Sequence, residues 1–151
     1  MKIKWMGNVD KNDSLNDVRM KMKPLEPRPS TKTTNLIYDV NYFGVNGCLL
    51  FNAFENGYRT GLENSVFYFE AYARDDADIA YSKIVESFKD YYGQPSKRDY
   101  FTMGGPEQNM KAGMHRITDY IWEDGETKLR FDYYFSVQNN CYVIIAETSR
   151  I

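Results

Sequence analysis

The residues best spaced for chemistry are oxygen-bearing side chains in the stretch VDKNDSLNDVRMKM, positions 9 to 22. Their spacing is similar to that of a calcium-binding loop, and they are Asp10, Asn12, Ser14, Asn16 and Asp17. Such a loop also needs a glycine at its sixth position and a bidentate glutamate at its twelfth. Counted from Asp10, these positions hold Leu15 and Lys21, so we predict no metal site in this stretch.

The same stretch has the pattern of a helix N-terminus. Ser14 is followed three residues later by Asp17, as in a capping box with Asp in place of the usual Glu. An apolar stripe at helical spacing follows at Leu15, Val18 and Met22. We therefore predict that a short helix begins at Ser14.

Other candidates for catalysis are few. His115 is the single histidine, and the chain contains no motif of a serine hydrolase, a zinc protease, a phosphate loop or a dinucleotide-binding fold. The carboxylates of Glu123 and Asp124 precede Gly125, which is typical of a turn. We expect a protein that is not an enzyme, with no catalytic residue, no bound metal and no cofactor.

Charge and composition narrow the classes of partner. The 151 residues carry a net charge of −2, and the mild excess of Lys and Arg in residues 1–34 faces an acidic remainder. A nucleic-acid binder normally presents a dense basic face, because neutralising phosphates supplies most of its affinity. We therefore expect no nucleic-acid partner.

Export and membrane insertion leave characteristic sequence patterns. No apolar run approaches the roughly 20 residues of a membrane-spanning helix, and the start MKIKWMGN lacks the apolar middle of a signal peptide. We expect a soluble, cytoplasmic chain, or an exported one if a signal peptide has been removed. Cys48 and Cys141 are predicted to be buried thiols, with a disulfide between them as the alternative in an exported protein.

Periodicity predicts two helices and six strands. Apolar residues recur at three-to-four spacing in DDADIAYSKIVESFKDYYGQP, which has an acidic start and ends at Gly93 and Pro95. Runs rich in aromatic and β-branched residues, separated by turn residues, predict strands at 36–43, 48–55, 64–73, 115–122, 127–135 and 141–148. The alternation in 127–135 is the clearest, with Leu129, Phe131, Tyr133 and Phe135 on a core face and the residues between them on a wet face.

The order of these elements repeats. A helix, a proline-bearing loop and three strands occupy 14–73, and the same order returns at 77–149. We predict a single domain, 1–151, of the α+β class, in which two tandem helix-β-β-β units form one curved six-stranded antiparallel sheet. Both helices are expected on one face of this sheet.

Three short patterns resemble a known group of proteins: SLNDVRMKM as a first helix, LLFNAFENG as a strand closing on a turn, and YYGQP at the end of a second helix. The chain is similar in these to small bacterial exported proteins and lipoproteins related in fold to beta-lactamase inhibitor protein. Lys23 departs from the glycine usual before the proline after the first helix, and a lipobox is absent. The resemblance implies helices on the convex side and a concave sheet face that grips another protein.

A partner-binding surface is therefore predicted on the helix-free face. Its aromatic residues are expected to be Tyr38, Tyr42, Tyr68, Tyr72, Tyr120, Trp122 and Tyr134. The loop 96–114 adds Tyr100 and Phe101 as a protruding tip. The alternative interpretations are that these rings pack against one another, and that the loop is a mobile surface loop.

The expected function is a protein-binding module, such as an inhibitor, an immunity or anti-defence protein, or an envelope-assembly factor, whose partner is another protein. The alternative is a carrier of a small apolar ligand, with a pocket lined by Phe51, Phe67, Phe69 and Phe131. Self-association through a sheet edge is also conceivable, because the strand at 141–148 is apolar enough to pair if it lies at a rim.

The capping interpretation can be tested directly. Ser14→Ala should lower the free energy of unfolding by about 1 kcal/mol, because the helix loses the acceptor for an N-terminal amide. Added calcium should leave the melting temperature of the wild-type chain unchanged. A calcium-dependent rise in melting temperature would support the metal interpretation instead.

Overall fold

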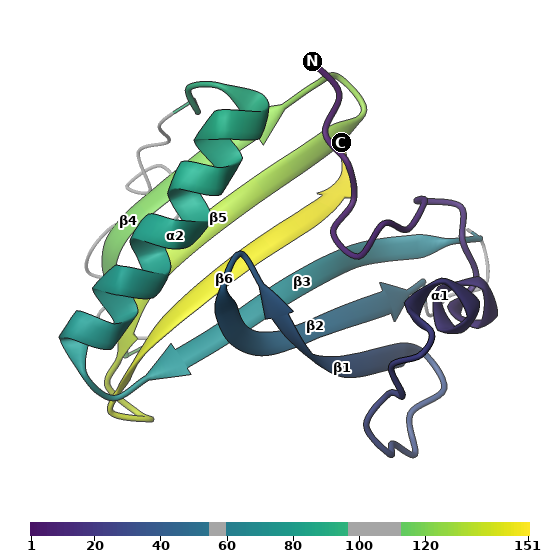
Figure 1. Ribbon diagram of the computed structural model, residues 1–151, viewed down its shortest axis with the longest axis horizontal. Coiled ribbons are helices and arrows are strands. Elements are labelled where there is room, and N and C mark those ends of the chain that lie inside the picture. Colours follow the sequence, from purple (N-terminus) through teal and green to yellow (C-terminus); the bar gives the residue numbers. More distant parts are fainter. Residues whose placement is uncertain (55–59, 97–112) are drawn as a thin grey trace.

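Six strands form one antiparallel sheet in the order β1-β2-β3-β6-β5-β4 (Figure 1). The computed structural model describes residues 1–54, 60–96 and 113–151. The strands are β1 (Asn35–Tyr42), β2 (Val45–Ala53), β3 (Leu62–Ala71), β4 (Met114–Glu123), β5 (Thr127–Ser136) and β6 (Cys141–Arg150). The predicted α+β class and the six strands are confirmed, whereas the tandem repeat stays a prediction.

The two predicted helices are α1 (Leu15–Met22) and α2 (Arg74–Tyr92). The capping box of α1 is confirmed: Ser14 Oγ accepts from the Asp17 N–H at 3.1 Å, and the Ser14 N–H donates to Asp17 Oδ2 at 2.9 Å. Helix α2 ends before Gly93, as predicted, and the φ of 76° at Gly93 lies in the left-handed region.

Both helices cover the same face of the sheet (Figure 1). Val18 of α1 and Ile84 and Phe88 of α2 belong to one core together with alternate residues of the strands. The strand residues without exposed surface in this core include Tyr38, Leu49, Phe51, Phe67, Phe131 and Ile144. The other face of the sheet carries no helix within the described residues, and we call it the helix-free face.

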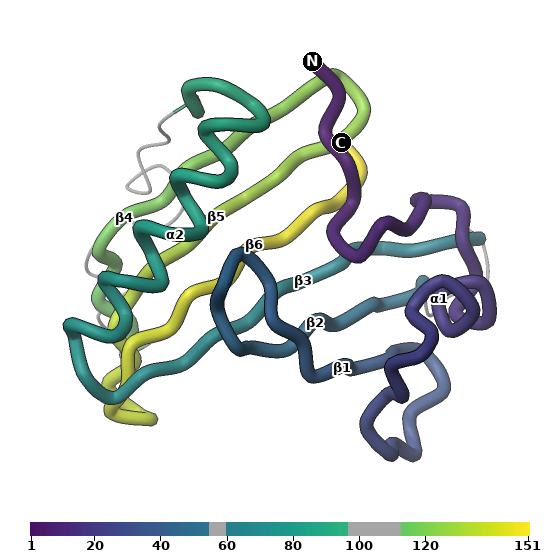
Figure 2. The backbone as a smooth tube through the Cα atoms, in the orientation of Figure 1, coloured from purple at the N-terminus to yellow at the C-terminus, as the bar shows by residue number. Residues whose placement is uncertain are grey.

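A third element covers the sheet beside the helices, and the sequence did not predict it. Residues 1–13, here called the strap, run without regular structure across the helix side of the sheet and lead into α1 (Figures 1 and 2). Its apolar side chains are buried in the common core: Ile3, Trp5, Met6 and Val9. The stretch MKIKWMGN is thus a core-forming segment of the fold.

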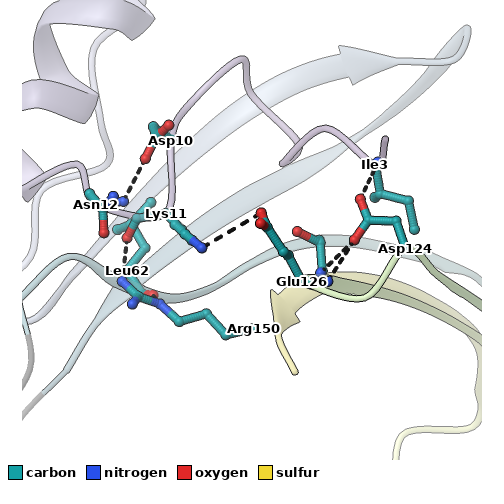
Figure 3. Close-up of polar contacts among 9 residues, drawn as sticks. Ile3, Asp10, Lys11, Asn12, Leu62, Asp124, Glu126 and Arg150 are labelled. Atoms are coloured by element: carbon teal, nitrogen blue, oxygen red, sulfur yellow. Dashed lines mark hydrogen bonds and ion pairs between the residues drawn. The ribbon is translucent and has the colours of Figure 1, made fainter. Parts of the chain in front are cut away.

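Polar contacts fix both ends of the strap (Figure 3). Asp124, in the β4–β5 turn, accepts from the backbone N–H of Ile3 at 2.6 Å and also from the N–H groups of Thr127 and Glu126 at 2.8 and 2.9 Å. Although burial opposes the shift, these three donors lower the pKa of the Asp124 carboxyl. The charge of Asp124 therefore ties the strap to the sheet.

The opposite end of the strap is held at Lys11. Its carbonyl oxygen accepts from the Leu62 N–H at 2.8 Å and from Arg150 Nη2 at 2.7 Å (Figure 3). Gly61 permits this approach, because a Cβ atom there would lie 2.2 Å from the Lys11 oxygen. This end of the strap is thus bonded to β3 and to β6, the two neighbouring strands at the centre of the sheet.

The strand order shows which strands lie at the edges of the sheet. Strand β6 lies between β3 and β5, so it offers no free edge for self-association. The edges are β1 and β4. Each is partly paired: the Arg28 N–H donates to the Ile37 carbonyl at 2.7 Å, and Ser96 and Ile121 exchange two backbone hydrogen bonds of 2.8 and 3.1 Å.

The structure tests the predictions about a disulfide and about membrane-spanning helices. Cys48 on β2 and Cys141 on β6 are both free thiols, with β3 between their strands, so the alternative of a disulfide is wrong. Cys141 is buried, as predicted, whereas Cys48 is half-buried. No helix in residues 1–54, 60–96 and 113–151 is both long and apolar enough to cross a membrane.

Removing the strap's anchor should destabilise the fold. Asp124→Ala leaves three N–H donors without their charged acceptor, and we expect the free energy of unfolding in urea to fall by about 1–3 kcal/mol at pH 7. Because the pKa of Asp124 is lowered, its stabilisation is complete above about pH 4 and is lost as the pH falls through the lowered pKa. The two proteins should therefore converge in stability toward acidic pH. Glu126→Ala removes an adjacent exposed carboxylate and should have little effect; equal effects of the two changes would contradict the anchor.

Candidate functional site

An apolar stripe crosses the helix-free face. The register places Ile37 opposite Leu50 and Leu50 opposite Val66, and it places Tyr68 of β3 opposite Ile145 of β6. These five side chains are half-buried, although no described helix covers them. We call this set the central stripe. It spans four neighbouring strands, β1, β2, β3 and β6.

Two carboxylates flank the centre of the stripe on β3 and β6. Glu70 lies two residues beyond Tyr68 on β3, and Glu147 lies two residues beyond Ile145 on β6, opposite Val66. The Tyr68 hydroxyl donates to Glu70, and burial together with this acceptor raises the pKa of the phenol. Tyr68 is therefore a neutral hydrogen-bonding group at neutral pH.

At the β1 edge the stripe ends in an ion pair. Arg28 reaches across the edge strand, and its Nε donates to both oxygens of Asp39 at 3.1 and 3.2 Å. This guanidinium lowers the pKa of the Asp39 carboxyl. Both side chains are more than half exposed, so the pair contributes little to stability but holds the proline-bearing loop 24–34 against the sheet.

Beyond the stripe, β4 and β5 carry a buried charge network that the sequence did not reveal. Arg116 lies 3.7 Å from Asp119 and 3.3 Å from Asp132, and Arg130 lies 2.9 Å from Asp132. The side chains of Arg116, Asp119 and Asp132 are 10% exposed or less. Asp132 was expected on a wet face, so that expectation is wrong. Because buried charges are costly unless paired, the two guanidinium groups and two carboxylates compensate one another.

A cavity of about 280 Å³ lies beside this network. Tyr134 and Ile145 line it together with Arg130 and Glu147, so it adjoins the central stripe. Burial raises the pKa of the Tyr134 phenol, and the carboxylate of Asp132 adds to the shift. Its volume lies just below the usual range of small-molecule sites, which begins at about 300 Å³.

Four of the predicted surface aromatics lie on the opposite, helix-covered face. Trp122 is 2% exposed and donates from Nε1 to the Gly93 carbonyl at 2.9 Å. The Tyr42 hydroxyl accepts from the Gly7 N–H at 2.7 Å, and the hydroxyls of Tyr120 and Tyr81 lie 2.9 Å apart. The predicted place on the helix-free face is therefore wrong for these three residues, because helix α2, the residue that ends it and the strap supply their polar partners.

Tyr38 is the fourth, and it has no exposed surface. Its hydroxyl finds no hydrogen-bond partner in the described parts of the chain, and burial raises its pKa. The ring makes an edge contact with Phe51 at a centroid distance of 6.0 Å. Tyr38 is thus a core residue, and its predicted place on the helix-free face is wrong.

The remaining predicted residues divide into two groups. Tyr68 and Tyr134 lie on the helix-free face, and Tyr72 directly follows β3 with 81% of its surface exposed. Tyr100 and Phe101, like most of the loop 96–114, lie outside the described residues. Fewer aromatic side chains therefore lie on the helix-free face than predicted, and aliphatic side chains supply most of its apolar surface.

The predicted ligand pocket within the sheet is filled by packing. Phe51, Phe67 and Phe131 have no exposed surface. Phe67 contacts Tyr42 and Phe43, and Phe131 contacts Tyr81 and Tyr120, all at ring centroid distances between 5.7 and 6.3 Å. The predicted pocket is therefore wrong for these three rings, which pack in the core, whereas Phe69, the fourth predicted lining residue, is half-buried and lines a cavity of about 980 Å³.

The chain matches no protein family, no curated protein and no solved structure. Its similarity to exported proteins related to beta-lactamase inhibitor protein stays a prediction. Over residues 1–54, 60–96 and 113–151, no group of three or more His, Cys, Asp or Glu side chains is arranged to hold a metal ion.

Two core substitutions should separate a packing role from a surface role. Tyr38→Phe removes a buried hydroxyl that has no described partner, so we expect unchanged or higher stability, by up to about 1 kcal/mol. Trp122→Phe removes the bond to Gly93 and leaves unfilled volume, and it should lower stability by about 2 kcal/mol. Urea denaturation measures both. If both rings were exposed, each change would shift stability by less than about 0.5 kcal/mol.

Proposed function

We propose that this chain is a non-enzymatic protein-binding module that docks another protein on its helix-free face. The observation that carries the proposal is the central stripe, a run of half-buried apolar side chains on four strands with no described helix over it. The loop 96–114, with Tyr100 and Phe101, is proposed as a second contact. An inhibitor, an immunity or anti-defence protein, or an envelope-assembly factor would use such a surface.

The composition of the stripe agrees with that of protein interfaces. Their centres are apolar and contain aromatic anchors, while their rims are polar and wetter. Tyr68 supplies a large ring at the centre, and Asp39, Glu70 and Glu147 form a polar rim. The cavity beside Tyr134 provides a place for a partner's anchoring side chain.

The charges around the stripe indicate the chemistry of the partner. Asp39 is neutralised by Arg28, and Arg116 and the half-buried Arg130 are paired with the buried carboxylates of Asp119 and Asp132. Glu70 and Glu147 form no ion pair within the described residues. A complementary partner presents an apolar centre flanked by Lys or Arg, since opposite charges at a rim steer association.

The test begins with a photoreactive benzophenone side chain placed at position 68 and exposed to a lysate of the producing cells. The crosslinked protein is identified and purified, and its affinity is measured for the double variant Val66→Thr, Tyr68→Thr. Threonine preserves strand propensity but removes the apolar centre. We expect affinity to fall by about tenfold or more, since central aromatic residues dominate interface energies.

The matched control is Met20→Thr with Ile79→Thr, which removes two exposed apolar side chains from the helices. This variant should bind as the wild type does. Tyr100→Ala with Phe101→Ala measures the contribution of the loop separately. Equal affinity of the wild type and the Val66 and Tyr68 double variant would reject the helix-free face as the docking site.

A further inference from the structure

A cavity of about 350 Å³ lies on the helix side of the sheet, away from the central stripe. The residues that line it belong to the strap, the β1–β2 hairpin, the C-terminal part of α2 and strands β5 and β6. Six aromatic residues line it: Trp5, Tyr42, Phe43, Phe88, Tyr91 and Tyr92. Its volume falls at the lower end of the range of small-molecule sites.

The aromatic walls are fixed by packing at the inner end. Trp5 and Phe88 are buried, and Phe43 contacts Phe88 edge-on at a centroid distance of 5.0 Å. Toward the opening, Tyr92 is half-buried and Tyr91 is exposed. A space with buried rings at its inner end and more exposed rings at its mouth suits a flat apolar ligand, which can stack against these rings or meet their edges.

One wall of the cavity is held in an unfavourable backbone conformation. Phe43 has a φ of 58°, in the left-handed region that Gly, Asn or Asp normally occupy in a two-residue hairpin turn. Its ring contacts Tyr42, Phe67 and Phe88, and these contacts offset the cost. The bulky ring is therefore retained at the cavity wall despite the turn geometry.

The charge at the mouth is positive. Among the described residues that line the cavity, Lys2 and Lys4 are the charged ones, and none of these described residues is acidic. Lys2 and Lys4 are exposed, whereas Ile3 and Trp5 are buried. This alternation is expected of an extended segment with one face against the core. Neither ammonium group forms an ion pair with any described residue.

We propose that this cavity binds a small planar aromatic acid. The ring system lies among the side chains of Trp5, Phe43, Phe88 and Tyr92, and the carboxylate lies at the mouth between Lys2 and Lys4. Charge-assisted contacts from the two ammonium groups then orient the ligand. The site is on the opposite side of the sheet from the protein-docking face, so it does not depend on the proposed function.

The probe is 2-naphthoate, titrated into the full chain by isothermal calorimetry. We expect saturable 1:1 binding at concentrations below about 1 mM, and affinity at least about tenfold lower for the uncharged 2-naphthalenemethanol. In NMR spectra the indole N–H of Trp5, a residue that lines the cavity, should shift on addition of 2-naphthoate. Absence of saturable binding in this range would overturn the proposal.

Two variants test the two halves of the site. Lys2→Gln with Lys4→Gln should reduce the affinity for 2-naphthoate by about tenfold and leave 2-naphthalenemethanol unaffected. Phe43→Asn suits the positive φ and so preserves the turn, but it removes a ring from the cavity wall. It should lower the affinity for both ligands. Lys23→Gln with Lys32→Gln removes the same charge from exposed positions elsewhere and should bind as the wild type does. If both double lysine variants lost the same affinity for 2-naphthoate, the binding would reflect nonspecific charge attraction, and the proposed site would be rejected.

Discussion

The register between β3 and β6 is the constraint on which the rest of the structure depends. This pair joins the meander β1-β2-β3 to the meander β6-β5-β4, and it sets Phe67 opposite Ala146 and Tyr68 opposite Ile145. A shift by one residue would exchange the two faces of a strand, because successive side chains point to opposite sides. Tyr68 would then enter the core, and Phe67 would lose the space above the small side chain of Ala146.

The same register creates the place where the strap fits. Ser65 and Thr148 face each other on the helix side and hydrogen-bond through their hydroxyls, with no exposed surface. These small polar residues leave room above the sheet, and the Met6 N–H donates to Thr148 Oγ1 at 3.4 Å. The strap buries Trp5 and Met6 in that space. The gap between the helices is thereby filled by chain rather than by a third helix.

Two surfaces of different character result. The helix-free face is broad and aliphatic around Tyr68, with carboxylates at its rim, which suits a macromolecule. The strap cavity is narrow and aromatic, with Lys2 and Lys4 at its mouth, which suits a small anion. The sheet separates them, so each can be altered without removing the other. Arg116 and Asp132 of the buried charge network line the small cavity beside Tyr134, which adjoins the helix-free face.

Local pattern determined the elements of this protein. The capping box at Ser14, the helix ending at Gly93 and the six strands follow from interactions within a few residues of the chain, and the strands begin and end within three residues of the predicted bounds. Alternation also showed that Leu129, Phe131 and Tyr133 share a core face. What alternation could not show is which face of the other strands the helices would cover. Tyr38 and Trp122 were predicted on the helix-free face because their aliphatic neighbours along the strand were assigned to the core face.

Tertiary structure decided the sites. Asp124 bonds to Ile3 across 121 positions, and Thr148 meets Met6 across 142. The central stripe takes Ile37, Leu50 and Val66 from three strands, and the cavity combines the strap with α2 and a hairpin turn. A single sequence carries no record of such distant pairs, because their energies arise only when packing brings the segments together. Periodicity reports the neighbours along the chain, whereas a binding surface is made of neighbours in space.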